Sequence, residues 1–320
     1  DIGLDLGLFN NRLRITTDYY KKKTTDLLYS VAVPATSGYQ TMLKNIGSIE
    51  NQGYELSIES DNLTGAFSWT TAFNIAFNRN KVLELGGEEY KEMAEGDGHL
   101  KTGSVRRLIV GEPIGVFYGY RFDGIFQNEE ECKQQTSSAS PIGVGLRRYK
   151  DLNGDGKVDA ANDREILGDA NPKFFGGLTN TFAYKGFELN VFLQYSYGNK
   201  ILNYNAMELE NPTGGQNAYA DMVNRWTPEN PSNIYPKATT NRALLVSDRF
   251  IEDGSYLKLK TLSLSYSFPK INLKHIQGLR LYVTGQNLLT WTKYRGYDPE
   301  VSYRGASTLE AGERSEERRV

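Results

Sequence analysis

The feature that most constrains this fold is an alternation of apolar and polar side chains over the eleven residues 187–197. A period of two places successive side chains on opposite faces of a β-strand. Eleven residues at roughly 3.3 Å each, tilted by about 45°, span about 25 Å, which is the height of the apolar band on an outer-membrane barrel. Strands of soluble proteins usually have about five or six residues. The segment therefore predicts a strand of a membrane barrel wall.

Similar alternating segments recur in pairs that are separated by short turns. The four predicted hairpins pair residues 1–9 with 12–23, 48–61 with 67–78, 174–184 with 187–197, and 255–268 with 279–288. Asn10 and Asn11 tolerate the positive φ of a tight turn, and Lys185 and Gly186 leave room for a two-residue turn only. Near Lys260 the apolar positions change from odd to even, which predicts a β-bulge.

Long connections separate the hairpins, at residues 24–45, 79–170 and 198–254. Short turns alternating with long loops are typical of outer-membrane barrels. Residues 113–126 resemble a strand, but a further crossing would put the Lys185-Gly186 turn on the wrong side, so we expect β-structure in an outer loop there. The predicted fold is all-β, an antiparallel transmembrane β-barrel wall of about eight strands. A large soluble β-sandwich is the alternative.

Composition supports strands and excludes several classes. Mean hydropathy is −0.53 and no window approaches the roughly 20 apolar residues of a membrane helix, which excludes a helical membrane protein. A net charge of −2 gives no reason to expect a nucleic-acid partner. The single Cys132 excludes an internal disulfide framework and a multi-cysteine metal site.

The faces of the wall follow from the cost of charge in lipid. A Lys or Arg facing lipid at mid-depth costs about 2 to 4 kcal/mol. We expect the polar residues of the repeat to face the lumen: Glu188, Asn190 and Gln194. We expect the apolar ones to face outer-membrane lipid: Phe187, Leu189, Val191 and Leu193. Aromatic residues near strand ends predict an interfacial girdle: Trp69, Tyr184, Tyr195 and Tyr197.

One loop carries a metal-binding pattern, DLNGDGKVD at 151–159. Oxygen-bearing side chains at its first, third and fifth positions and a glycine at the sixth match the front half of an EF-hand calcium loop. The twelfth position is Asn162 instead of Glu, and Asp163 comes one residue late. The predicted ligands of a structural calcium ion are Asp151, Asn153, Asp155, Lys157 through its carbonyl, Asp159 and Asp163. Asx-turns without metal are the alternative.

Catalysis has little support, and no cofactor is required. The two histidines, His99 and His275, lie in loops, and no local motif marks a nucleophile or a phosphate-binding loop. We therefore expect no enzyme activity. Several loop aromatics either stack on sugar rings or pack loops together: Tyr39, Tyr204, Tyr219, Trp226, Tyr235, Trp291 and Tyr294.

Six blocks resemble the SusC-like (SusC/RagA) TonB-dependent outer-membrane transporters over nearly all of residues 1–300. In order they are NIGSIENQGYELSI at 45–58, VGEPIGVFYGYRFDGIFQ at 110–127, DLNGDGKVD at 151–159, NPKFFGGLTNTFAYKGFELNVFLQYSYGNKI at 171–201, DGSYLKLKTLSLSYSFP at 253–269 and LRLYVTGQNLLTWTKYRGYDPE at 279–300. The resemblance implies a 22-stranded barrel around a plug in the outer membrane of a Gram-negative cell. It also implies energy from TonB, a SusD-like surface lipoprotein as partner, and import of oligosaccharides or peptides.

We expect residues 1–300 to be a C-terminal portion of such a barrel. The plug and the TonB-contacting segment would precede Asp1, and one more strand would follow. Residues 301–320 are expected to be a loop remnant and a non-native tail, since RSEERRV at 314–320 resembles a translated sequencing adapter. Two alternatives stay open, a small passive or structural outer-membrane barrel and a soluble carbohydrate-binding β protein.

Overall fold

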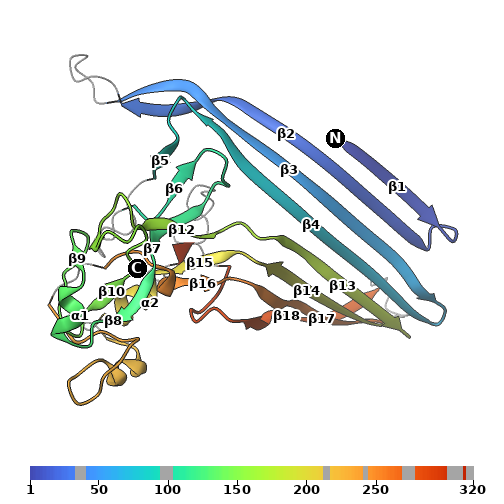
Figure 1. The fold of residues 1–320 in the computed structure, drawn as a ribbon. Helices are drawn as coiled ribbons and strands as arrows, with labels where there is room; N and C mark the ends of the chain where they lie inside the picture. Colours follow the sequence, from blue (N-terminus) through green and yellow to red (C-terminus); the bar gives the residue numbers. More distant parts are fainter. Residues whose placement is uncertain are drawn as a thin grey trace.

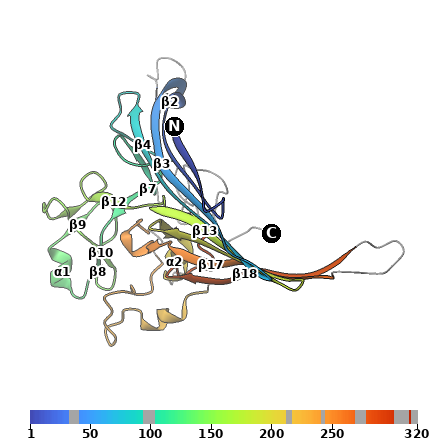
Figure 2. The same cartoon turned by 90° about the vertical axis from the view of Figure 1, so that its right-hand side faces the viewer.

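The computed structural model describes residues 1–32, 41–93, 104–211, 217–240, 244–268, 278–300 and 313–314. Its main feature is one antiparallel sheet in the order β1-β2-β3-β4-β13-β14-β17-β18 (Figure 1). The strands are Ile2–Leu8, Leu13–Ala32, Thr41–Thr64, Phe67–Leu85, Phe174–Tyr184, Phe187–Tyr197, Tyr256–Phe268 and Leu279–Thr292. Figure 2 shows the sheet strongly twisted, as expected for strands of L-residues.

The turns follow the backbone preferences of their residues. Asn10 and Asn11 have φ of 58° and 62°, and Phe9 shares the left-handed conformation at 56°. Lys185 and Gly186 have φ of 47° and 87°, the two positive values that a two-residue hairpin turn requires. Both predicted turns are therefore confirmed. The predicted turn after Phe268 falls at residues 269–277, outside the described part.

The predicted bulge is also confirmed. Along β17 the pairing with β14 goes from Leu259 opposite Leu193 to Thr261 opposite Phe192, so Lys260 has no partner there. The pairing with β18 breaks at the same place, where Asn287 has a φ of 51°. The extra residue explains why the apolar positions of β17 change parity along the strand.

The predicted connection at 24–45 is wrong, because β2 continues to Ala32 and β3 begins at Thr41. The polar run from Lys21 to Asp26 breaks the apolar alternation, and for this reason the predicted strand ends at residue 23. Backbone pairing does not need that alternation outside lipid, and two register shifts between Thr24 and Leu28 accommodate the irregular residues. Strand β4 likewise continues beyond the predicted end to Leu85, and β18 to Thr292.

Aromatic rings form two belts on the apolar face of the sheet. The turn-end belt, near the short turns, includes Trp69 on Phe182 at 5.8 Å and Phe187 on Tyr266 at 4.5 Å between ring centroids. The loop-end belt, at the other ends of the strands, joins Phe77, Phe174 and Tyr197. Two belts on one face are what an interfacial aromatic girdle requires.

Two long loops build a separate body of small elements at one end of the sheet (Figures 1 and 2). Between β4 and β13 lie β5 Tyr90–Glu92, β6 Arg107–Ile109, β7 Val116–Tyr120, β8 Phe122–Ile125, α1 Glu129–Lys133, β9 Thr136–Ser137, β10 Arg147–Tyr149, β11 Lys157–Val158 and β12 Arg164–Asp169. Between β14 and β17 lie β15 Lys200–Asn203, α2 Tyr204–Leu209, the 3-10 helices η2 Ala220–Asn224 and η3 Asp248–Phe250, and β16 Ile251–Asp253. Residues 113–126 are β-structure outside the main sheet, as predicted.

The largest hydrophobic core lies in this loop body and not in the sheet. Val105 and Phe117 from the first loop pack with Leu202, Met207 and Phe250 from the second, all nearly inaccessible to solvent. A second cluster joins Val82 of β4 to Leu108 of the first loop. The loop body is therefore a folded unit that is attached to the end of the wall.

The sheet has two open edges. Within the described strands, β1 pairs only with β2, and β18 only with β17. Unpaired backbone groups at a sheet edge are not tolerated in hydrocarbon. The predicted fold class is confirmed as an antiparallel wall that is part of a larger barrel.

Two further observations concern elements outside the wall. None of the described helices has the length and the apolar composition to cross a membrane. In the predicted tail, the described residues are Glu313 and Arg314, which form β19 (Glu313–Arg314) beside β15. The predicted division at residue 300 stays a prediction.

Candidate functional site

The predicted calcium loop lies in the loop body between β10 and β12. The Asp151 carboxylate accepts hydrogen bonds from the backbone N–H of Gly154 at 2.7 Å and of Gly156 at 2.6 Å. Asp155 accepts from Lys157 N–H at 2.8 Å and from the Asn153 amide at 2.9 Å. The loop thus has the tight Asx-turn geometry of the alternative interpretation.

Asp163 connects the two ends of this loop through hydrogen bonds. It is fully buried, and its two oxygens accept backbone N–H groups of Leu152 and Asp159, each at 2.7 Å. Asp159 in turn receives the Lys157 ammonium at 3.2 Å, and hydrogen bonds from Asn162 N–H and this ammonium lower the pKa of its carboxyl group. In the described part of the chain, no three His, Cys, Asp or Glu side chains are grouped so as to hold a metal ion. The calcium site stays a prediction.

The polar face of the wall carries hydrogen-bonded and ion-paired side chains. Arg14 contacts Glu59 at 3.0 Å, and Arg280 contacts Glu188 at 2.7 Å. The Asn190 amide donates to the Thr181 hydroxyl at 2.9 Å. These groups stand on the face opposite the aromatic belts, so the wall has one polar face and one apolar face.

The segment that follows β18 folds back onto this polar face. The Lys258 ammonium, fully buried, contacts both Asp298 oxygens at 3.0 Å and also Glu300. Lys260 at the bulge reaches Glu300 at 2.8 Å. Burial alone would raise the pKa of Glu300, but hydrogen bonds from the two lysines outweigh it and lower that pKa to about 2. The bulge thus places a second ammonium beside the same carboxylate.

A charge cluster around the buried Glu210 links two segments of the loop body to the segment that follows β18. The Glu210 carboxylate, at the end of α2, contacts Arg249 at 2.6 Å and Arg295 at 2.9 Å. Arg295 also contacts Glu252 at 2.8 Å. Burial disfavours the charged form of Arg295, but its hydrogen bonds to the two carboxylates dominate and raise its pKa. These residues were not predicted, because 39 and 85 positions separate Glu210 from its partners.

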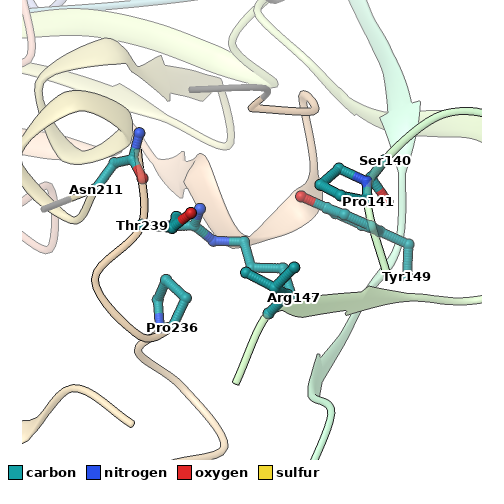
Figure 3. Close-up of a pocket in the computed structure, with 8 residues that line it drawn as sticks. Ser140, Pro141, Arg147, Tyr149, Asn211, Pro236 and Thr239 are labelled. Carbon is teal, nitrogen blue, oxygen red and sulfur yellow. The ribbon is translucent and has the colours of Figure 1, made fainter. Parts of the chain in front are cut away.

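A pocket of about 30 Å³ lies next to this cluster (Figure 3). Its lining residues are Ser140, Pro141, Leu146, Arg147, Tyr149, Asn211, Pro236 and Thr239. Figure 3 shows the Arg147 side chain extending from β10 toward Thr239. Its Nη2 donates to the Glu210 carbonyl at 3.0 Å, and its buried Nε has no hydrogen-bond partner. Burial lowers the pKa of this guanidinium.

The other sequence-based candidates have mixed outcomes. Of the loop aromatics, Tyr204, Trp226 and Tyr294 are buried, so packing is the correct interpretation for them. Trp291 is half exposed but stands on β18 and not in a loop. Tyr39, His99 and His275 lie outside the described residues.

Comparison with known proteins relates this geometry to transporters. No family model matches the chain. It is 41% identical over 307 residues to TonB-dependent receptor P3 of Formosa agariphila, covering 95% of the chain and 30% of that protein. It is 29% identical over 313 residues to TonB-dependent receptor SusC of Bacteroides thetaiotaomicron, covering 93% of the chain and 29% of that protein.

Among solved structures, the chain is similar to the RagAB peptide transporter, with a TM-score of 0.76 and 26% identity over 97% of the chain and 32% of the solved one. This chain is homologous to the SusC-like TonB-dependent receptors. The resemblance predicted from the six sequence blocks is thereby confirmed, and so is the predicted location in an outer-membrane barrel wall. The chain spans about 30% of the length of the curated relatives it matches.

Proposed function

We propose that this chain forms part of the wall and outer loops of an outer-membrane importer that is energised by TonB. The observation that carries the proposal is the combination of a wall with one polar and one apolar face and a folded loop body at one end, in a chain homologous to SusC-like receptors. A SusD-like lipoprotein is the proposed partner at the outer surface, and oligosaccharides or peptides are the proposed cargo.

The proposal is tested by uptake in cells. The gene that encodes the complete transporter is deleted, and uptake of fluorescently labelled oligosaccharides and peptides is measured with and without TonB. We expect uptake of one cargo class to be lost both in the deletion mutant and in cells without TonB. The complete gene should restore this uptake in the deletion mutant. Uptake that continues at the normal rate without TonB would indicate the passive pore instead.

Partner and location have separate tests. Affinity purification of the tagged transporter from detergent-solubilised outer membrane is expected to recover a surface lipoprotein in equal amount. Recovery of the chain from aqueous extract would favour the soluble carbohydrate-binding alternative.

The proposed function contains no catalytic step and no required cofactor. Cargo that is incubated with the purified transporter is therefore expected to keep its mass. A structural calcium ion in the loop at 151–159 is a separate proposal, supported by the spacing of its oxygen-bearing side chains.

A further inference from the structure

The pocket beside β10 has a polar, buried floor and a rim in solvent. Arg147, Tyr149, Asn211 and Pro236 are buried, whereas Pro141 is exposed. Ser140 and Thr239, on opposite loops, are half-buried at the rim. A ligand group that enters past the rim therefore meets a guanidinium at the bottom.

Of the arginines at and beside the pocket floor, Arg147 has no carboxylate counter-ion among the described residues. Arg249 and Arg295 share the carboxylates of Glu210 and Glu252 through ion pairs. Arg147 contacts the carbonyl oxygen of Glu210 and not its carboxylate. No carboxylate of the described residues forms an ion pair with Arg147. The buried guanidinium group of Arg147, the largely buried one of Arg249 and the solvent-exposed one of Arg295 thus stand against two carboxylates.

Such an arrangement is costly unless an anion completes it. A buried charge without a partner loses its hydration, and a buried donor without an acceptor is a rare defect in folded proteins. A guanidinium is well suited to bind a carboxylate through parallel N–H donors. The Arg147 Nε–H, which has no acceptor, is available as the donor, and the pocket beside the side chain has space for a carboxylate group.

We propose that this pocket binds a single carboxylate group of a ligand, with Arg147 as the charged donor and Ser140 and Thr239 at the entrance. A volume of about 30 Å³ admits the charged end group only, so the rest of the ligand would lie outside the rim. The ligand would be the cargo, and in this respect the inference rests on the proposed import function. A peptide C-terminus and a uronic acid supply the same chemistry.

Binding is tested on the complete transporter purified in detergent, without any measurement of import. The probe is trifluoroacetate, whose ¹⁹F line broadens when the ion exchanges between solution and the detergent-solubilised transporter. Competitors are used in matched pairs, triglycine with triglycine amide and glucuronic acid with glucose. We expect the acids to displace the probe and the neutral partners to leave it bound. The two acids distinguish peptide from uronate, and sodium bromide tests for a halide site.

Three variants connect the binding to this pocket. Arg147→Met removes the charge at similar length and is expected to weaken binding by about tenfold or more, the loss typical of hydrogen bonds to a charged group. Ser140→Trp closes the rim while it leaves Arg147 in place, so it tests the site even if Arg147→Met does not fold. Ser138→Trp is the matched control, because Ser138 is exposed and lies outside the pocket.

Several results would overturn the inference. They are equal competition by acids and their neutral partners, competition by bromide as effective as that by the acids, or full probe binding in a folded Ser140→Trp variant. Loss of uptake with intact carboxylate binding would contradict the import function only.

Discussion

Asp163 is the residue on which the loop at 151–159 depends in the structure. It has no exposed surface, and it accepts one backbone N–H from each end of the loop. The sequence marked Asp163 as a late calcium ligand, but it could not indicate this role, because backbone contacts 11 and 4 positions away follow no motif.

Asp163→Ala is expected to destabilise the loop locally by about 2 kcal/mol, because two partly buried N–H groups lose a charged acceptor. Hydrogen exchange of residues 152–159 in the complete transporter measures the effect. Asp155→Ala is the control, since Asp155 is exposed and accepts a backbone N–H only from Lys157, so faster exchange without calcium should be confined to Lys157. Similar exchange in the two variants would contradict the assigned role.

Calcium itself is tested in the same loop. If the spacing of Asp151, Asn153 and Asp155 forms a cation site, added calcium should slow protease cleavage at 151–159, and Asp155→Ala should abolish this protection. The Lys157 ammonium beside Asp159 would have to give way to the ion. Cleavage that is unaffected by calcium in the unmodified protein would remove the metal prediction.

Strand β14 allows the two faces of the wall to be compared at neighbouring positions. Val191 lies opposite Asn180 and Leu262 on the apolar face, whereas Asn190 lies on the polar face with Thr181. Val191→Arg is expected to cost about 2 to 4 kcal/mol at mid-depth and to reduce the amount of assembled barrel. Asn190→Arg should assemble nearly normally. Heat-modifiable migration of the complete transporter on gels measures assembly, and equal losses would contradict the assigned faces.

The segment after β18 has a defined response to acid. The folded pKa of Glu300 is about 2, below the value of about 4.3 for a free glutamate, so its contribution to stability is complete above about pH 4.3 and is lost as the pH falls toward 2. Pepsin cleavage of residues 293–300 should therefore accelerate between these pH values. Glu300→Gln should be cleaved rapidly throughout this range. Cleavage of the unmodified protein that is independent of pH would argue against the ion pairs.

Strands were predictable where lipid dictates the pattern. The hairpin turn at Lys185, the bulge at Lys260 and the alternation of β14 are local in sequence, and all three are confirmed. Strand ends were not predictable in the same way. Beyond the hydrocarbon, residues such as Lys21 and Lys23 remain paired in the ladder without an apolar face, so the alternation that identifies the strand in the sequence ends before the strand itself ends.

At the scale of the whole molecule, the loop body was the part that sequence could not describe. Its core joins residues of the first loop, such as Phe117, to residues of the second, such as Phe250. The Arg147 pocket also combines both loops, and the charge cluster joins the second loop to Arg295 after β18. No periodicity connects these positions, because their neighbourhood is created only when β13 and β14 bring the two loops together. The family resemblance indicated that the loops face outward, but it did not indicate a common core.

The shared core of the two loops has a consequence for the order of folding. Phe117 and Phe250 meet only after the chain between them, including the β13–β14 hairpin, has been placed, so these contacts close a long segment and form slowly. The hairpin itself closes through two residues and can form early. We therefore expect the wall to insert first, with loop segments still open, and the outer body to condense afterwards on the outside of the cell.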